Sequence, residues 1–340
     1  MKKLFLTMVI ALMSTAMSFG QNTLVATLDH NGEISVYYGS GALIQAYDNA
    51  NPGDVVTLSS GTFQTPIFTK AITVRGAGMQ YDEVLDRDYT YLVGQPDYNG
   101  SRIQIEGDSL LKGTEDLIFE GLRFGELGRR GRGYNSYEMS TRICKTQFIK
   151  CYFTTSFTHF YDDSEFTMVN CRLRLGTSGY CDNLTLINCL VNDVPQKGIF
   201  MNCVFDGGVS QDATASYENC CFIASSTDAL PITATVRNCV STRSNTFINL
   251  PNSTNKYVEI QNLFKTATSG EMYSESENYE LTDEAKTLYL GTDGTQVGIY
   301  GGLAPYNATP SNPQITKFNV AQKATADGKL SVDITVNGAE

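Results

Sequence analysis

One short motif recurs along the middle of the chain and constrains its fold more than any other feature. An apolar residue, a variable residue and a corner residue are followed by cysteine, a variable residue and, in most copies, a second apolar residue. The motif occupies residues 148–153, 168–173, 186–191, 200–205, 217–222 and 236–241, with variants that lack the cysteine at 119–124 and 260–265. A unit this small cannot bury its own apolar face, so the copies are expected to stack on one another.

The spacing between the corners varies, whereas the corner itself stays nearly constant. Neighbouring corners lie between 14 residues apart (Asn188 to Asn202) and 29 residues apart (Gly121 to Lys150). Apolar residues alternate on both sides of each corner, which predicts a strand, a bend and a second strand. Asn and Gly tolerate the left-handed backbone of a sharp bend, and Asn side chains of successive copies can form a hydrogen-bonded ladder. The predicted ladder consists of Asn170, Asn188, Asn202, Asn219 and Asn238.

Six of the nine cysteines fill the position after the corner, where the alternation points inward. Their spacing excludes a zinc site built on close cysteine pairs, and parallel side chains do not fit the torsion of a disulfide. We therefore expect a column of buried thiols formed by Cys151, Cys171, Cys189, Cys203, Cys220 and Cys239. Cys144, Cys181 and Cys221 lie outside this column, and one pair among them could oxidise.

A helix is predicted ahead of the first strands. Ala42, Leu43, Ala46 and Ala50 share one face of it, and the Pro-Gly pair at 52–53 ends it. With its constant corners and variable loops, the chain resembles the right-handed parallel β-helix of the pectate-lyase-like class over roughly residues 36–265. The resemblance implies an all-β fold, a right-handed parallel β-helix solenoid with an N-terminal capping helix at about 41–51 and a small C-terminal β tail.

The two ends of the chain predict its compartment and its domains. Lys2 and Lys3 precede an apolar stretch at 4–17 that is too short to cross a bilayer, in the style of a Gram-negative export signal. We expect a signal peptide at 1–20, the β-helix with its cap at 21–302, and a Pro-containing linker with a short β-hairpin at 303–340. The chain is predicted to be exported to the periplasm, the cell surface or the medium, and not to span a membrane.

Charge and the few histidines limit the chemistry. With 36 acidic and 25 basic side chains, the net charge of -11 argues against a nucleic-acid partner. His159 lies beside Asp162 and Asp163, which are candidates for a catalytic carboxylate pair or for calcium ligands. The polygalacturonase branch of this fold also carries adjacent aspartates, but its Asn-Thr-Asp, Gly-His-Gly and Arg-Ile-Lys segments are absent here. The alternative for this stretch is a solvated loop between two coils.

Arginine offers a second kind of site. Two places after the corner, Arg123, Tyr152 and Arg172 should project outward from successive coils and form a shelf for an acidic sugar. Three further arginines lie in the 29-residue step: Arg129, Arg130 and Arg132. Lyases on this fold use Arg or Lys as a base, often with calcium, so Arg172 is also a candidate catalytic residue. The alternative is that exposed arginines only keep the solenoid soluble.

A second group of outward-facing side chains is apolar and would promote association if it were exposed to solvent. Its members precede the corner by one place or follow it by two: Ile149, Val169, Ile187, Met201, Leu190, Val204, Cys221, Val240 and Phe264. Either the C-terminal segment or a long loop should cover this lateral face, or a partner protein should bind it.

These observations favour an exported β-helix protein that engages polysaccharide at the cell surface or in the periplasm without catalysis. The first alternative is a polysaccharide lyase or hydrolase acting on acidic glycans, and the second is a structural or adhesive surface module. No cofactor and no metal are expected, and calcium is a candidate only if the chain is a lyase. No catalytic subfamily of the fold is matched by residues of this chain.

Overall fold

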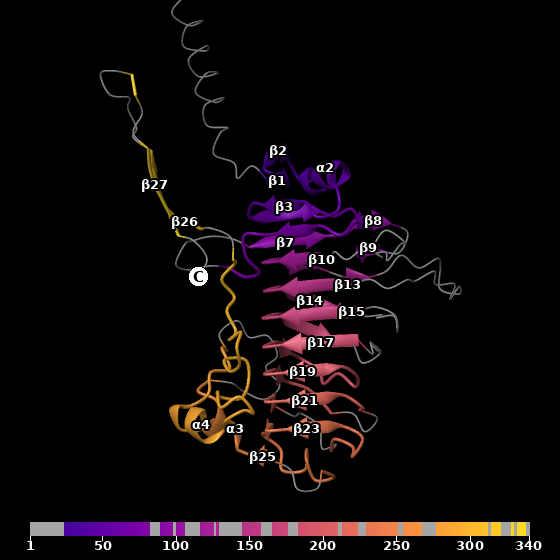
Figure 1. Cartoon of the computed structure of the whole chain (residues 1–340), viewed down its shortest axis with the longest axis vertical. Coiled ribbons are helices and arrows are strands. Elements are labelled where there is room, and N and C mark those ends of the chain that lie inside the picture. The colour runs from indigo at the N-terminus through magenta and orange to yellow at the C-terminus, as the bar shows by residue number, and fades with distance from the viewer. Residues whose placement is uncertain are drawn as a thin grey trace, which may run out of the picture.

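The computed structural model describes residues 24–81, 89–97, 100–105, 116–125, 127–128, 145–157, 165–175, 183–209, 213–223, 229–250, 254–266, 277–311, 314–320, 328–329 and 332–337. The expected signal peptide at 1–20 lies outside these ranges. The fold is mostly β, and its strands stack in long parallel columns consistent with a parallel β-helix-like solenoid (Figure 1).

The first sheet has 11 strands and runs the whole length of the stack. From β3 onward every neighbouring pair in it is parallel, so each coil contributes one strand at the same place. In spatial order its strands are β2 (Glu33–Tyr38), β1 (Val25–His30), β3 (Val55–Leu58), β6 (Thr73–Arg75), β10 (Leu117–Glu120), β13 (Lys145–Ile149), β15 (Glu165–Val169), β17 (Asn183–Ile187), β19 (Ile199–Met201), β21 (Ser216–Glu218) and β23 (Thr235–Arg237).

The second sheet has 10 strands, and in the coils that carry the repeated motif its strand begins directly after the corner. Its strands in spatial order are β4 (Gly61–Gln64), β7 (Thr90–Val93), β11 (Arg123–Phe124), β14 (Tyr152–Phe157), β16 (Arg172–Leu175), β18 (Leu190–Val191), β20 (Val204–Phe205), β22 (Cys221–Phe222), β24 (Val240–Ser241) and β25 (Lys256–Tyr257). A third, smaller sheet closes the first coils and consists of β5 (Ile67–Phe68), β9 (Gly100–Ile105) and β12 (Leu127–Gly128), with β8 (Gln95–Asp97) paired to β9.

The corners between the first and second sheets have the left-handed backbone that the motif predicts. The five ladder asparagines have φ between 48° and 57°, Lys150 has φ 53° and Gly121 has φ 64°. These residues stack because the strands on either side pair in register, for example Met168 with Leu186. The repeated corner therefore determines where each coil turns.

Buried thiols and aromatic rings fill the interior. The six column cysteines are fully buried and none forms a disulfide, and the Cys151 amide donates to the Cys171 sulfur at 3.4 Å. Burial raises the pKa of the Cys171, Cys203 and Cys239 thiols well above the usual value, so they stay protonated. The rings of Phe119 and Phe148 stack at 5.3 Å beside this column.

The last coil departs from the prediction. Asn262 was expected to be the final corner, but it lies in helix α3 (Ile260–Leu263). The chain instead turns at Thr254, one rung below Asn238, and Asn255 takes the inward position that cysteine holds elsewhere. The Asn255 side chain accepts from the Cys239 amide at 2.8 Å and donates to the Val236 carbonyl oxygen at 3.2 Å. The side-chain amide of Asn255 thus ends the column of thiols. It forms hydrogen bonds with backbone groups of the last coils, which have no following coil to pair with.

The 14-residue coil depends on Gly198. This residue has φ 121°, and a Cβ atom there would lie 2.4 Å from the carbonyl oxygen of Leu184 in the previous coil. Only glycine allows the backbone to pass so close to its neighbour. The short step between Asn188 and Asn202 is therefore built without breaking the pairing of β17 with β19.

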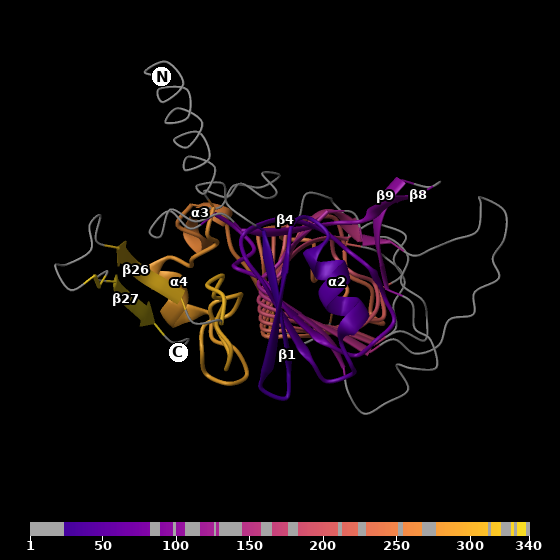
Figure 2. The same cartoon turned by 90° about the horizontal axis from the view of Figure 1, so that it is seen from above.

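A helix and a hairpin close the N-terminal end of the stack. Helix α2 (Ala42–Asn49) buries Ala42, Leu43 and Ala46 and lies across the interior in the view from above (Figure 2). Strands β1 and β2 add an antiparallel hairpin to the first sheet. His30 Nδ1 lies 2.8 Å from Asp54 Oδ1, which ties the hairpin to the turn after α2.

The C-terminal part of the chain folds back beside the solenoid. Residues 258–266 and 277–311 include helices α3 and α4 (Asp283–Leu288), and we call them the C-terminal cover. The helices lie beside the lower coils, and residues 309–311 reach the corners at Lys150 and Gly121 (Figure 1). Strands β26 (Gln314–Val320) and β27 (Val332–Asn337) then form an antiparallel hairpin. Among the described residues, no helix has the length and apolar character needed to cross a membrane.

Candidate binding face

One row of side chains projects outward from the second sheet, and in the coils of the repeated motif its members stand two places after the corner. Arg123 pairs with Tyr152 and Tyr152 with Arg172, as the motif predicts. The full row, which we call the outward row, consists of Thr62, Tyr91, Arg123, Tyr152, Arg172, Leu190, Val204, Cys221, Val240 and Lys256. Its upper members are polar or aromatic and its lower members are largely apolar.

Arg123 lies between two tyrosine rings. Its guanidinium carbon is 4.5 Å from the ring centre of Tyr89 and 4.7 Å from that of Tyr152. Tyr89 also packs edge-to-face on Tyr91, the next member of the row, at 6.4 Å. We call Tyr89, Tyr91, Arg123 and Tyr152 the tyrosine clamp. Its first three members are half-buried and Tyr152 is buried, so the clamp presents ring and guanidinium surface to solvent.

Tyr89 and Tyr91 were not among the predicted site residues. The alternation in residues 89–93 gives a signal for a strand, but its corner lies far upstream, at residues 76–78. The repeated motif therefore does not extend to this coil.

Arg172 is much less accessible than Arg123. Its side chain is 6% exposed and donates from Nε to the Tyr306 hydroxyl at 3.0 Å. Burial alone would lower the pKa of Arg172, but Tyr306 and neighbouring tyrosines raise it overall. Arg172 therefore stays protonated, and a protonated guanidinium is a poor proton acceptor. Tyr306 comes from the C-terminal cover, so the cover ends the accessible part of the row.

The four members of the outward row that follow Arg172 are apolar and buried. Leu190, Val204, Cys221 and Val240 pack against residues of the cover. The covering residues include Phe264, Tyr279, Leu281, Ala285, Val297 and Ile299. Cys221 is a free thiol whose pKa is raised well above the usual value by burial. The expected internal cover of the apolar face is therefore present over these four coils.

The cover also binds the corners. The Asn188 side chain donates to the carbonyl oxygens of Ile299 and Gly301 at 2.8 and 2.7 Å. Asn219 accepts from the Thr292 amide at 2.9 Å, and Lys150 donates to the Thr309 carbonyl oxygen at 2.8 Å. Among the described ladder asparagines these contacts replace the expected hydrogen bonds from one Asn side chain to the next. The side-chain amides of Asn188, Asn219 and Asn238 therefore dock the returning chain.

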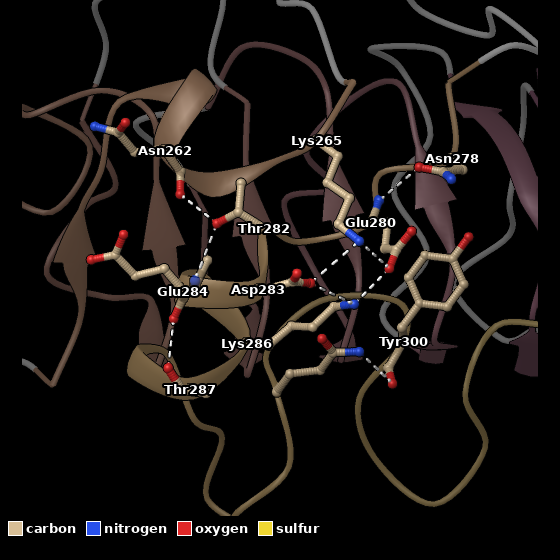
Figure 3. Close-up of polar contacts among 12 residues, drawn as sticks. Asn262, Lys265, Asn278, Glu280, Thr282, Asp283, Glu284, Lys286, Thr287 and Tyr300 are labelled. Carbon is tan, nitrogen blue, oxygen red and sulfur yellow. Dashed lines mark hydrogen bonds and ion pairs between the residues drawn. The ribbon is translucent and has the colours of Figure 1, made fainter.

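Ion pairs hold the cover itself together (Figure 3). Glu280 accepts from Lys265 at 2.9 Å and from Lys286 at 2.5 Å, which joins the end of α3 to α4. Hydrogen bonds from Lys286 and Lys265 lower the pKa of Glu280 to about 2. Thr282 caps α4 by accepting from the Ala285 amide at 3.1 Å. These contacts are exposed and are expected to weaken with salt.

Several predicted site residues lie outside the described residues. They are His159, Asp162, Asp163, Arg129, Arg130 and Arg132, together with Cys144 and Cys181. Their proposed catalytic, calcium-binding, ligand-binding or disulfide roles stay predictions. Among the residues that the structure describes, no group of three or more His, Cys, Asp or Glu side chains is placed to hold a metal ion.

Comparison with known proteins gives no match. No family model matches the chain, no curated protein is significantly similar in sequence, and no solved structure is significantly similar to its fold. Function therefore has to be argued from the residues themselves.

Proposed function

We propose that this chain is an exported right-handed β-helix protein of the pectate-lyase-like class that binds acidic polysaccharide without cleaving it. The tyrosine clamp is the proposed binding site. The observation that carries the proposal is Arg123 held between the rings of Tyr89 and Tyr152 on a lateral face. The N-terminal sequence supports export to the periplasm, the cell surface or the medium of a Gram-negative cell.

The chemistry of the clamp suits a charged sugar. Tyrosine rings bind the apolar faces of sugar rings, and their hydroxyls add hydrogen bonds at the edge. The ring contacts use the flat faces of the Arg123 guanidinium, whereas recognition of a carboxylate or a sulfate uses its N–H edge. Because the chain carries a net charge of -11, this attraction must be local and should be screened by salt.

Two observations favour binding over catalysis. Arg172, the predicted base, is buried beneath Tyr306 with a raised pKa. The segments that define the polygalacturonase branch are also absent from the sequence.

The test is a glycan array probed with the purified chain at low and high salt. We expect retention of uronate-containing or sulfated glycans, a loss at high salt, and at least a tenfold loss of affinity for Arg123→Ala. Arg237→Ala is the matched control, because Arg237 is an exposed arginine on the first sheet, away from the clamp. Equal binding by Arg123→Ala and Arg237→Ala would show that the tyrosine clamp is not the binding site. Release of ultraviolet-absorbing unsaturated uronates would establish a lyase instead.

A further inference from the structure

The N-terminal edge of the first sheet is unusually apolar. β2 is the last strand of this sheet and, within the described residues, it pairs only with β1. Ile34, Val36 and Tyr38 are 59%, 46% and 62% exposed. They share one face of the strand because side chains alternate. On the opposite face Tyr37 packs against the core.

This edge lacks the usual protection against strand pairing. All six residues of β2 pair with β1 in an unbroken register, so no bulge twists the edge away. The strand contains neither lysine nor proline, and Glu33 at its start is its only charge. Natural sheets normally protect a long, apolar edge with such features, because its unpaired N–H and C=O groups can bind another strand.

We propose that β2 pairs antiparallel with β2 of a second copy of this chain, about a two-fold axis normal to the sheet. With Val36 on the axis, Val36 lies opposite Val36 of the second copy, and Ile34 lies opposite its Tyr38. Opposed residues in an antiparallel pair share a face, so all six apolar side chains meet. The same register places each Glu33 opposite Gly39 and keeps the two carboxylates at opposite ends.

Self-complementarity favours a closed dimer over a filament. A filament would join β2 to β23, the last strand at the other end of the first sheet. The outward residues of β23 are Thr235 and Arg237, which are exposed and polar. In a filament these polar side chains of β23 would lie opposite the apolar side chains of β2. In a dimer the apolar side chains of β2 lie opposite those of the second β2. An isologous contact also pairs the β2 edges of both copies with each other, so no β2 edge remains for a third copy and association stops at a dimer.

Sedimentation of the purified chain tests the assembly. We expect the mass of a dimer for the wild type and of a monomer for Val36→Lys, since the axis would bring two ammonium groups together. Ile248→Lys is the control, because Ile248 is 73% exposed in the last coil and should leave the dimer intact. Circular dichroism melts confirm that both variants fold. A wild type that is monomeric at roughly 100 µM, or a dimer that survives Val36→Lys, overturns the proposal.

Oxidative cross-linking tests the register. In Val36→Cys the Cβ atoms of the two opposed cysteines lie about 5 Å apart, so oxidation should give a covalent dimer. Ile34→Cys should not cross-link, because in this register the two introduced cysteines lie four residues apart along the paired strands. The wild-type chain gives the background from its own cysteines. Equal cross-linking of the two variants, or none of either, contradicts this register, and neither result depends on glycan binding.

Discussion

The two halves of the outward row on the second sheet share one backbone and differ in what their side chains meet. In the upper half, Tyr91, Arg123 and Tyr152 belong to the tyrosine clamp, in which Arg123 lies between the rings of Tyr89 and Tyr152 and Tyr89 packs on Tyr91. Leu190 and Val204, on the next rungs, are buried under the C-terminal cover. The repeat decides only which way a side chain points. Its chemistry decides whether the face stays accessible or binds another part of the chain.

Arg172 marks the border between the halves. It is a member of the row by register, yet the cover reaches it through Tyr306. The cover therefore determines how many rungs remain for a ligand.

The largest expected effect comes from charging the covered half. Val204→Asp puts a carboxylate into a fully buried apolar contact and should lower the free energy of unfolding by about 4 kcal/mol. Ile199→Asp, at a side chain that is 52% exposed on the first sheet, should cost about 1 kcal/mol. Urea unfolding of both variants measures the difference. Similar losses would mean that the cover does not seal this half.

A smaller effect separates the docking of the cover from the shape of the corner. Asn188→Ala and Asn170→Ala both put alanine at a left-handed position, which costs about 1 kcal/mol in each. Only Asn188→Ala also removes the bonds to the Ile299 and Gly301 carbonyl oxygens, so it should lose about 2 kcal/mol more. Urea unfolding again gives the values. Equal losses would show that these two bonds contribute nothing to stability.

The smallest effect concerns the ion pairs inside the cover. Because the pKa of Glu280 is lowered to about 2 from its usual 4.5, its ionised form stabilises the fold above pH 4.5, and this contribution is lost as pH falls toward 2. The melting temperature of Glu280→Gln should lie slightly below that of the wild type at pH 6. The difference should vanish near pH 2 and shrink in high salt. A difference that is constant from pH 2 to 6 would exclude the ion pairs as its cause.

The sequence predicts most of the solenoid because its corners require particular residues. A left-handed bend at Asn170 or Asn188 admits few side chains, and the cysteine beside each corner must fit the same narrow interior. Asn262 shows where this reasoning fails, since residues 260–263 have the motif's pattern but form a helix. The motif is a local pattern, whereas a segment joins the stack only if it pairs with a neighbouring coil. In the last coil this pairing is made by Lys256, which lies beside Val240.

The N-terminal hairpin and the docking contacts of the cover were harder to predict than the capping helix, which lies where the sequence places it. The turn of the β1–β2 hairpin is formed by Asn31 and Gly32, a pair that strongly favours hairpins and that could have been recognised. Tyr306 gives no comparable signal. Its contact with Arg172 spans 134 residues and involves no repeated pattern. The need for a cover is visible in the apolar row, but its docking sites are not.

The contact between Asn188 and Ile299 has a consequence for the order of events during folding. Coils can stack one after another in chain order, because a rung needs only its predecessor. The bond to Ile299 must wait for another 111 residues. Until the cover docks, Val204 and its neighbours face water on an otherwise stacked solenoid, so docking of the cover is the step that removes this apolar face from solvent.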